Sequence, residues 1–175
     1  MTTDRSRLGP PAGRHLPPVY LTLHDCSRLR ALLATERARV APQVRSVLQR
    51  EIDRATLCPS LAIPADVVTM HSRVVFRSHP GQPQESRTLC YDEEDALVGG
   101  TLSILTPLGA ALIGLRCGAT MPYEALDGRR LLAMVEAVPY QPQAHGRSVG
   151  QLRRLWPARS AGAGRPDDDP GPSAA

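Results

Sequence analysis

Histidine, cysteine and acidic residues are the side chains of this 175-residue sequence that could carry out catalysis or bind a metal. The five His and four Cys are scattered along the chain, and no two Cys have the CxxC spacing of a zinc site. The acidic run 92–95 could offer carboxylates, but consecutive residues of an extended chain point alternately to opposite sides. No Ser or Cys lies in a nucleophile-elbow pattern, and no Gly-rich segment matches a phosphate-binding loop. We therefore expect no enzyme: no catalytic residue, no metal site, no cofactor and no small-molecule substrate.

Arginine is the other residue type whose side chain could carry out chemistry or bind a partner. All 21 basic residues are Arg, which excludes reactions that need a lysine, such as Schiff-base formation. Residues 1–55 hold ten Arg against five acids, whereas residues 56–145 hold six against nine. A basic front and an acidic body indicate a charged partner, either nucleic acid or an enzyme that acts on nucleic acid. Solvated helix faces would explain the same charges without any partner.

The predicted ordered chain lies between two extensions. Residues 1–17 and 146–175 are rich in Pro, Gly and Arg without apolar periodicity, which predicts disorder. Between them we expect a strand plus helical hairpin at 18–58 and a sheet domain at 62–145. The first residues contain no apolar run typical of a signal peptide, so we expect a cytoplasmic protein with reduced cysteines.

The first unit should contain two helices. Residues 19–23 suit a short strand, and Asp25 can cap the helix that follows. Pro42 then begins a second helix, in which apolar residues recur every three or four positions. Helices of about 14 residues are each about 20 Å long. We expect them to project from the sheet domain as a short antiparallel coiled coil, with an acid-free tip at 39–43.

The second unit should be a sheet with one short helix. Strands are expected at 67–77, 87–91, 102–105, 121–125 and 131–138. Thr106 and Pro107 are a helix start, and the helix should cover 108–115. The stretch 96–115 has no charge and nearly the length of a membrane span, but its Gly and Pro favour strand, turn and helix. The element order predicts an α+β fold: a short N-terminal helical hairpin followed by an antiparallel-dominated sheet with one short helix.

Three segments carry a family resemblance. Residues 63–74 (IPADVVTMHSRV), 105–116 (LTPLGAALIGLR) and 140–144 (YQPQA) resemble the signature of the bacterial regulator of nucleoside diphosphate kinase. The resemblance spans about 18–145, with the motifs in the family's order. This family is related to the Gre transcript-cleavage factors, so the resemblance implies an FKBP-like C-terminal domain that binds RNA polymerase near its secondary channel.

The resemblance also implies a difference from Gre factors. In those factors a long coiled coil enters the channel and carries acids at its tip, which help to hold the catalytic magnesium. The predicted helices here are short, and residues 39–43 contain no Asp or Glu. The sequence therefore predicts a protein that docks like a Gre factor and competes with it, but does not stimulate RNA cleavage.

Six residues are the candidates for partner binding. In Gre factors the Ser-Pro turn before the short helix lies on the polymerase-contact face, and Thr106 and Pro107 occupy that place here. Leu105 stands where those factors often carry an acid, and Leu108 would complete an apolar patch. Arg39 and Arg45 are the candidates on the hairpin. The alternative for Thr106 and Pro107 is that they only cap the helix.

Two other functions remain open. The Arg-rich hairpin could bind nucleic acid, although no aromatic residues alternate with its arginines for base stacking. An FKBP-like domain could be a prolyl isomerase, which needs an aromatic-lined pocket, and the chain has only one Phe, one Trp and four Tyr. Nothing resembles a kinase or a kinase-binding motif, so an effect on nucleoside diphosphate kinase would be indirect.

Overall fold

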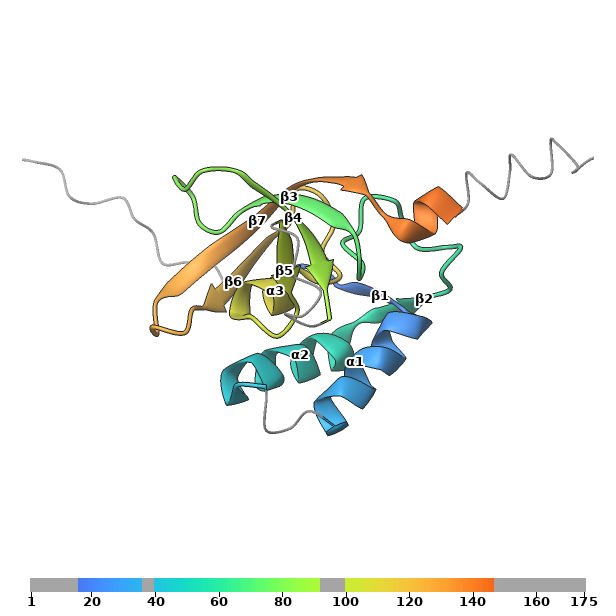
Figure 1. Ribbon diagram of the computed structural model, residues 1–175, viewed down its shortest axis with the longest axis horizontal. Helices are drawn as coiled ribbons and strands as arrows, with labels where there is room; N and C mark the ends of the chain where they lie inside the picture. Colours follow the sequence, from blue (N-terminus) through green and yellow to red (C-terminus); the bar gives the residue numbers. More distant parts are fainter. Residues whose placement is uncertain (1–15, 36–39, 92–99, 147–175) are drawn as a thin grey trace, which may run out of the picture.

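The computed structural model describes residues 16–35, 40–91 and 100–146, and the predicted disordered extensions and acidic run lie almost entirely outside these ranges. The elements are β1 (Tyr20–Thr22), α1 (Leu23–Thr35), α2 (Pro42–Arg54), β2 (Thr56–Cys58), β3 (Arg73–Arg77), β4 (Glu85–Cys90), β5 (Thr101–Ser103), α3 (Pro107–Leu112), β6 (Thr120–Glu124) and β7 (Arg130–Tyr140) (Figure 1). The chain is thus α+β, with the helices and the mostly antiparallel sheet in the predicted order.

Five strands form the main sheet, in the order β5-β4-β3-β7-β6. Its neighbours are antiparallel except β4 and β5, which run parallel. The β6–β7 hairpin closes through Asp127 and Gly128, a residue pair typical of a tight turn; Gly128 has a φ of +80° and Ala125 N–H donates to the carbonyl of Arg129. The strands predicted at 67–77 and 87–91 correspond to β3 and β4, which pair as an antiparallel hairpin. β3 is shorter than predicted and β4 is longer.

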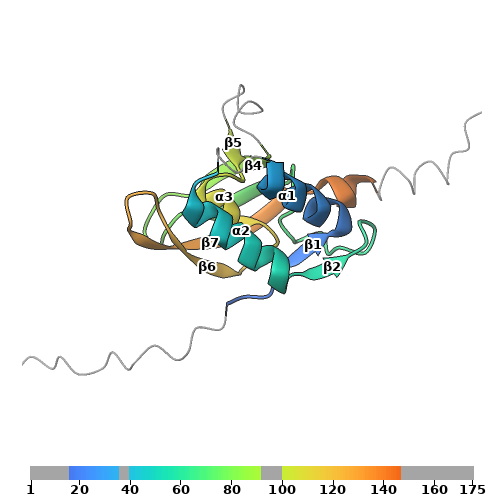
Figure 2. The same cartoon turned by 90° about the horizontal axis from the view of Figure 1, so that it is seen from below.

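The two long helices lie against the sheet domain and do not project from it (Figures 1 and 2). α2 packs on α3, and its buried Val44, Leu48 and Ile52 belong to the same apolar core as Phe76 of β3. The expectation of a projecting hairpin is therefore wrong. The physical reason is that the apolar stripe of α2 gains more by burial against the small residues of α3 than by contact with α1 alone.

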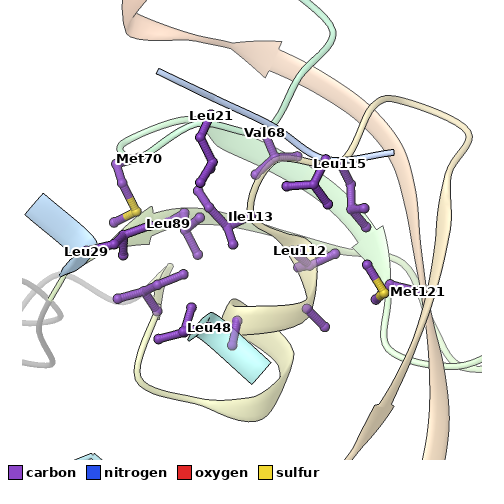
Figure 3. Close-up of a cluster of buried hydrophobic side chains, with 14 of the residues drawn as sticks. Leu21, Leu29, Leu48, Val68, Met70, Leu89, Leu112, Ile113, Leu115 and Met121 are labelled. Atoms are coloured by element: carbon purple, nitrogen blue, oxygen red, sulfur yellow. The ribbon is translucent and has the colours of Figure 1, made fainter. Parts of the chain in front are cut away.

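A single core joins the N-terminal segment to the sheet. Figure 3 shows side chains from β1 and α1 beside those of the sheet and of the segment that follows α3, with Leu48 of α2 approaching α3. The fully buried members that it labels are Leu21, Leu29, Leu48, Val68, Met70, Leu89, Leu112, Ile113, Leu115 and Met121. The segments 18–58 and 62–145 therefore depend on each other for burial of their apolar surface.

The start of α1 differs from the prediction by one turn. The helix begins at Leu23, and the Oγ1 of Thr22 accepts a 2.9 Å hydrogen bond from the backbone N–H of Asp25. Thr22 is thus the N-cap, while Asp25 lies in the first turn and is buried. The prediction of Asp25 as the cap was wrong because a hydroxyl residue three positions earlier already performs that role.

Two strands also differ from the prediction. β3 begins at Arg73, since residues 67–72 form a loop in which His71 has a φ of +62°. This loop buries Ser72 and also Thr69, which a continuous strand over 67–77 would place on the exposed face with His71. β2 was not predicted at all, and it pairs in parallel with β1. Three residues are too few to give a strand periodicity, so only the tertiary pairing defines it.

Gly114 is the closest backbone approach between the N-terminal segment and the sheet domain. It follows α3 with a φ of +75°, and its carbonyl accepts a 2.9 Å hydrogen bond from Tyr20 N–H. A Cβ at this position would lie 2.5 Å from Cγ1 of Val19 and 2.8 Å from the carbonyl oxygen of Tyr20. Both the backbone conformation and the space therefore require glycine. Within the described residues, no helix has the length and apolarity needed to cross a membrane.

Candidate docking surface

The turn before α3 is fixed by its own hydrogen bonds. Thr106 caps the helix: its Oγ1 accepts from Gly109 N–H at 3.1 Å and donates to the carbonyl of Ser103 at 2.7 Å. The Oγ of Ser103 accepts from Leu105 N–H at 3.1 Å, and Pro107 occupies the first helical position. A Cβ on Gly109 would lie 2.1 Å from the Ser103 carbonyl oxygen, so this approach needs a glycine. The predicted helix start is confirmed, and α3 is shorter than predicted because Gly114 ends the segment.

The four candidate residues of this turn are all half-buried. Leu105 and Leu108 pack partly against the core, so they present only part of their side chains to solvent. Pro107 lines a groove of the surface, and it is the one residue of the four that does so. The turn is therefore a rigid mount for a small apolar contact.

A groove of about 1170 Å³ separates α2 from the β6–β7 hairpin. One wall is the α2 face with Gln43, Val47 and Arg50, and α3 contributes Pro107. The other wall comes from β6 and β7, and the residues lining it are Thr120, Pro122, Tyr123, Glu124, Arg130, Leu131 and Leu132. Leu16 and Pro17 line it as well. Tyr123 donates to the carbonyl of Ser78 at 3.2 Å, and burial raises the pKa of its hydroxyl.

The two hairpin arginines proposed as contacts have different outcomes. Arg39 lies outside the described residues. Arg45 is half-buried in α2, and its Nη2 donates to the carbonyl of Val40 at 3.3 Å. The guanidinium of Arg45 thus has a contact inside the chain, at the link between α1 and α2, and its role in partner binding stays a prediction.

A buried ion pair fixes the end of α2. Glu51 is 1% exposed, and Arg54 Nε donates to its Oε2 at 2.6 Å, while Arg50 Nε lies 3.1 Å from its Oε1. Arg54 also donates from Nη1 to the carbonyl of Pro17 at 2.6 Å. The spacing of three residues lets Glu51 and Arg54 pair along the helix, and the pair ties α2 to the segment that enters β1.

Asp25 and Tyr91 form a polar contact between α1 and the sheet domain that sequence reasoning missed. Tyr91 Oη donates to Oδ1 of the buried Asp25 at 3.0 Å, and Met70 N–H lies 3.4 Å from its Oδ2. Arg28 lies over the Tyr91 ring at 4.9 Å, and the His71 ring meets it edge-on at 5.6 Å. Burial, and secondly the charge of Asp25, raise the pKa of the Tyr91 hydroxyl well above its ordinary value.

Replacing Tyr91 by Phe should therefore change the response of the protein to alkaline pH. Because the folded state raises the pKa of Tyr91, this group stabilises the fold below about pH 10 and loses that contribution as pH rises further. We expect Tyr91→Phe to cost about 1–2 kcal/mol at pH 8 through the lost bond to Asp25. The variant should also lose less stability than the parent as pH rises from about 10 towards about 12, measured by urea denaturation. Equal losses in Tyr91→Phe and the parent would contradict this account, and Tyr140→Phe, whose ring is 40% exposed, serves as control.

The residues of two motif segments meet in one buried network. Gln141 is buried and donates from Nε2 to the carbonyls of Pro64 and Val67, each at 2.8 Å. Thr69 Oγ1 bonds Ser72 Oγ and Oε1 of Gln143, again each at 2.8 Å. The polar residues of these two motif segments thus have a structural role, because their hydrogen bonds hold the loop 64–72 against the end of β7.

The described residues hold no group of three or more His, Cys, Asp or Glu placed to bind a metal ion. His79 instead accepts a 3.2 Å hydrogen bond at Nδ1 from Leu132 N–H, and His145 stacks at 4.4 Å on Tyr140. The acidic run 92–95 lies outside the described residues. The chemistry that these residues offer is a contact surface of apolar side chains and guanidinium groups.

Comparison with known proteins adds a family context to this geometry. A family model described as transcription elongation factor, GreA/GreB, C-term matches residues 63–140, and one described as Rnk N-terminus matches residues 17–57. Curated proteins named regulator of nucleoside diphosphate kinase, from Escherichia coli (strain K12) and Shigella flexneri, are each 35% identical over 130 residues, covering 74% of this chain and 95% of theirs. A solved structure titled prokaryotic transcription elongation factor GreA/GreB from Nitrosomonas europaea is 32% identical with a TM-score of 0.56, covering 71% of this chain and 99% of that chain.

Proposed function

The chain belongs to the family of the regulator of nucleoside diphosphate kinase, and from this premise we propose that it is a non-enzymatic regulator that binds RNA polymerase near the secondary channel. Its residues 63–140 match the C-terminal family model of the GreA/GreB transcription elongation factors. The observation that supports the proposal is the rigid turn 105–108, which we expect to lie on the polymerase-contact face because of the family resemblance. Its capped helix start and the outward surface of Pro107 suit a preformed contact. An effect on nucleoside diphosphate kinase then follows indirectly, through transcription.

We further propose that the protein occupies the Gre site without stimulating RNA cleavage. α1 and α2 have 13 residues each, about 20 Å by helix rise, and both pack on the sheet domain. Residues 36–39 lie outside the described residues, and the sequence 36–41 carries Glu36 as its single carboxylate beside two Arg. Short packed helices with one carboxylate are poorly suited to help hold the catalytic magnesium ion of a distant active site.

The two alternative functions gain no support from the geometry. Among the helix arginines, Arg28, Arg45, Arg50 and Arg54 all make contacts inside the chain, which reduces the charge available for phosphates. Tyr123 is the one aromatic ring among the described residues that line the groove, whereas prolyl isomerisation needs an aromatic-lined pocket.

A competition experiment tests the proposal. With purified core RNA polymerase, we expect the protein to bind and to displace a labelled Gre factor, and to add no RNA cleavage of its own. Pro107→Asp should weaken polymerase binding about tenfold or more, because it places a charge in an apolar contact, while Asp is well tolerated in a first helical turn. Pro59→Asp, at an exposed proline away from the groove, should bind like the parent. Saturating protein that leaves Gre binding unchanged would refute the competition, and equal binding by the two variants would refute the contact.

A further inference from the structure

We propose that α2 and the β6–β7 hairpin extend the contact at Pro107 into one groove, and that this groove takes a segment of RNA polymerase whose apolar side chains are flanked by carboxylates. This inference rests on the proposed function. It adds a second wall, from the N-terminal helices, to a contact that the resemblance places on the sheet domain alone.

The α2 wall is a helix face that the core covers only in part. Gln43, Val47 and Arg50 are spaced by four and three residues, so they lie on one side of the helix. Val44 and Leu48, on the neighbouring face, are buried in the core, whereas Val47 is half-buried and Arg50 is exposed. The packing of α2 on α3 aims this second face at the groove, beside Pro107.

The opposite wall offers apolar surface between charges. Pro122, Leu131 and Leu132 are half-buried, and Arg130 is exposed at the end of the same hairpin. Arg130 lines one wall of the groove and Arg50, whose Nε also lies 3.1 Å from Oε1 of Glu51, lines the other, against one lining acid, Glu124. An occupant with an apolar centre and acidic flanks would satisfy both the half-buried apolar surface and the excess positive charge.

The shape favours a polypeptide bound through its side chains. The volume of 1170 Å³ exceeds the range of roughly 300–1,000 Å³ that is usual for small-molecule pockets. β6 is an edge strand of the sheet, but Pro122 at its centre has no N–H to donate, which disfavours the addition of a partner strand. Pro17, held by Arg54, keeps the N-terminal segment in place along the groove lining.

The test compares charge changes on the two walls in binding to purified core RNA polymerase. Val47→Glu and Arg130→Glu should each weaken binding about tenfold, because both add negative charge where acidic flanks are expected. Arg130 is exposed, so its variant should fold even if Val47→Glu does not, as checked by circular dichroism. The matched control is Gln49→Glu, on the solvent side of α2, which should bind like the parent.

The outcomes separate this inference from the proposed function. If Pro107→Asp weakens binding and folded Val47→Glu and Arg130→Glu do not, the groove proposal fails and the proposed function stands. If the parent does not bind polymerase, both fail. A photo-crosslinker at position 131 should join an acidic, apolar segment of polymerase, and crosslinks to nucleic acid or to a second copy of this chain would overturn the assignment of the occupant.

Discussion

Gly114→Ala is expected to lower the free energy of unfolding by about 3 kcal/mol or more. Alanine would have to keep a φ of +75°, which costs about 1 kcal/mol or more by itself. Its Cβ would also overlap Cγ1 of Val19 and the Tyr20 carbonyl oxygen, and neither the buried side chain nor the backbone of β1 can move away cheaply in a closed core. Urea denaturation followed by circular dichroism measures the change.

Gly118→Ala is the matched control for this effect. Gly118 has a φ of +83°, but a Cβ there would meet no atom within 4 Å. We therefore expect Gly118→Ala to lower the free energy of unfolding by only about 1–2 kcal/mol, through the strained backbone conformation alone. Equal losses at the two positions would show that the close approach of β1 to Gly114 does not determine stability.

Glu51→Ala is expected to destabilise the fold by about 3 kcal/mol, the lower part of the range for breaking a buried ion pair. The carboxylate is 1% exposed and accepts from Arg54, which would keep its positive charge in a largely buried place. The lower part of the range applies because the Arg54 side chain is 24% exposed and can regain some water. Thermal and urea unfolding of the variant provide the measurement.

Asp53→Ala controls for the loss of any carboxylate on α2. Asp53 is exposed and accepts a 2.9 Å hydrogen bond from Gln49, so its removal should cost less than about 0.5 kcal/mol. A Glu51→Ala variant as stable as Asp53→Ala would mean that the Glu51–Arg54 pair does not anchor α2 to the N-terminal segment.

Local chemistry made part of this fold predictable from sequence. Pro42 and Thr106-Pro107 mark helix starts through interactions within one turn, and both are where they were predicted. The Asp127-Gly128 turn likewise depends only on adjacent residues. The docking of α2 on α3 could not be read in this way, because an apolar helix stripe shows that the helix is buried without showing against what.

The candidate surface was predictable only in part, for the same reason. The turn 105–108 was found through the family resemblance, since its motif is continuous in sequence. The groove brings together α2, α3 and the β6–β7 hairpin, and no sequence spacing links Val47 to Leu131. The signal that could have suggested the α2 wall is Val47, an apolar residue offset from the line of Val44, Leu48 and Ile52.

The pairing of Tyr20 with Gly114 has a consequence for synthesis on the ribosome. Residues 18–58 leave the exit tunnel before the groups that they pack against. The carbonyl that accepts from Tyr20 belongs to Gly114, 94 positions later, and the α3 surface that covers Leu48 begins at Pro107, 59 positions after that residue. Until residue 114 emerges, the nascent helices expose their apolar faces to solvent, where chaperones can bind them. The N-terminal third of this protein therefore completes its packing only after the middle third has been translated.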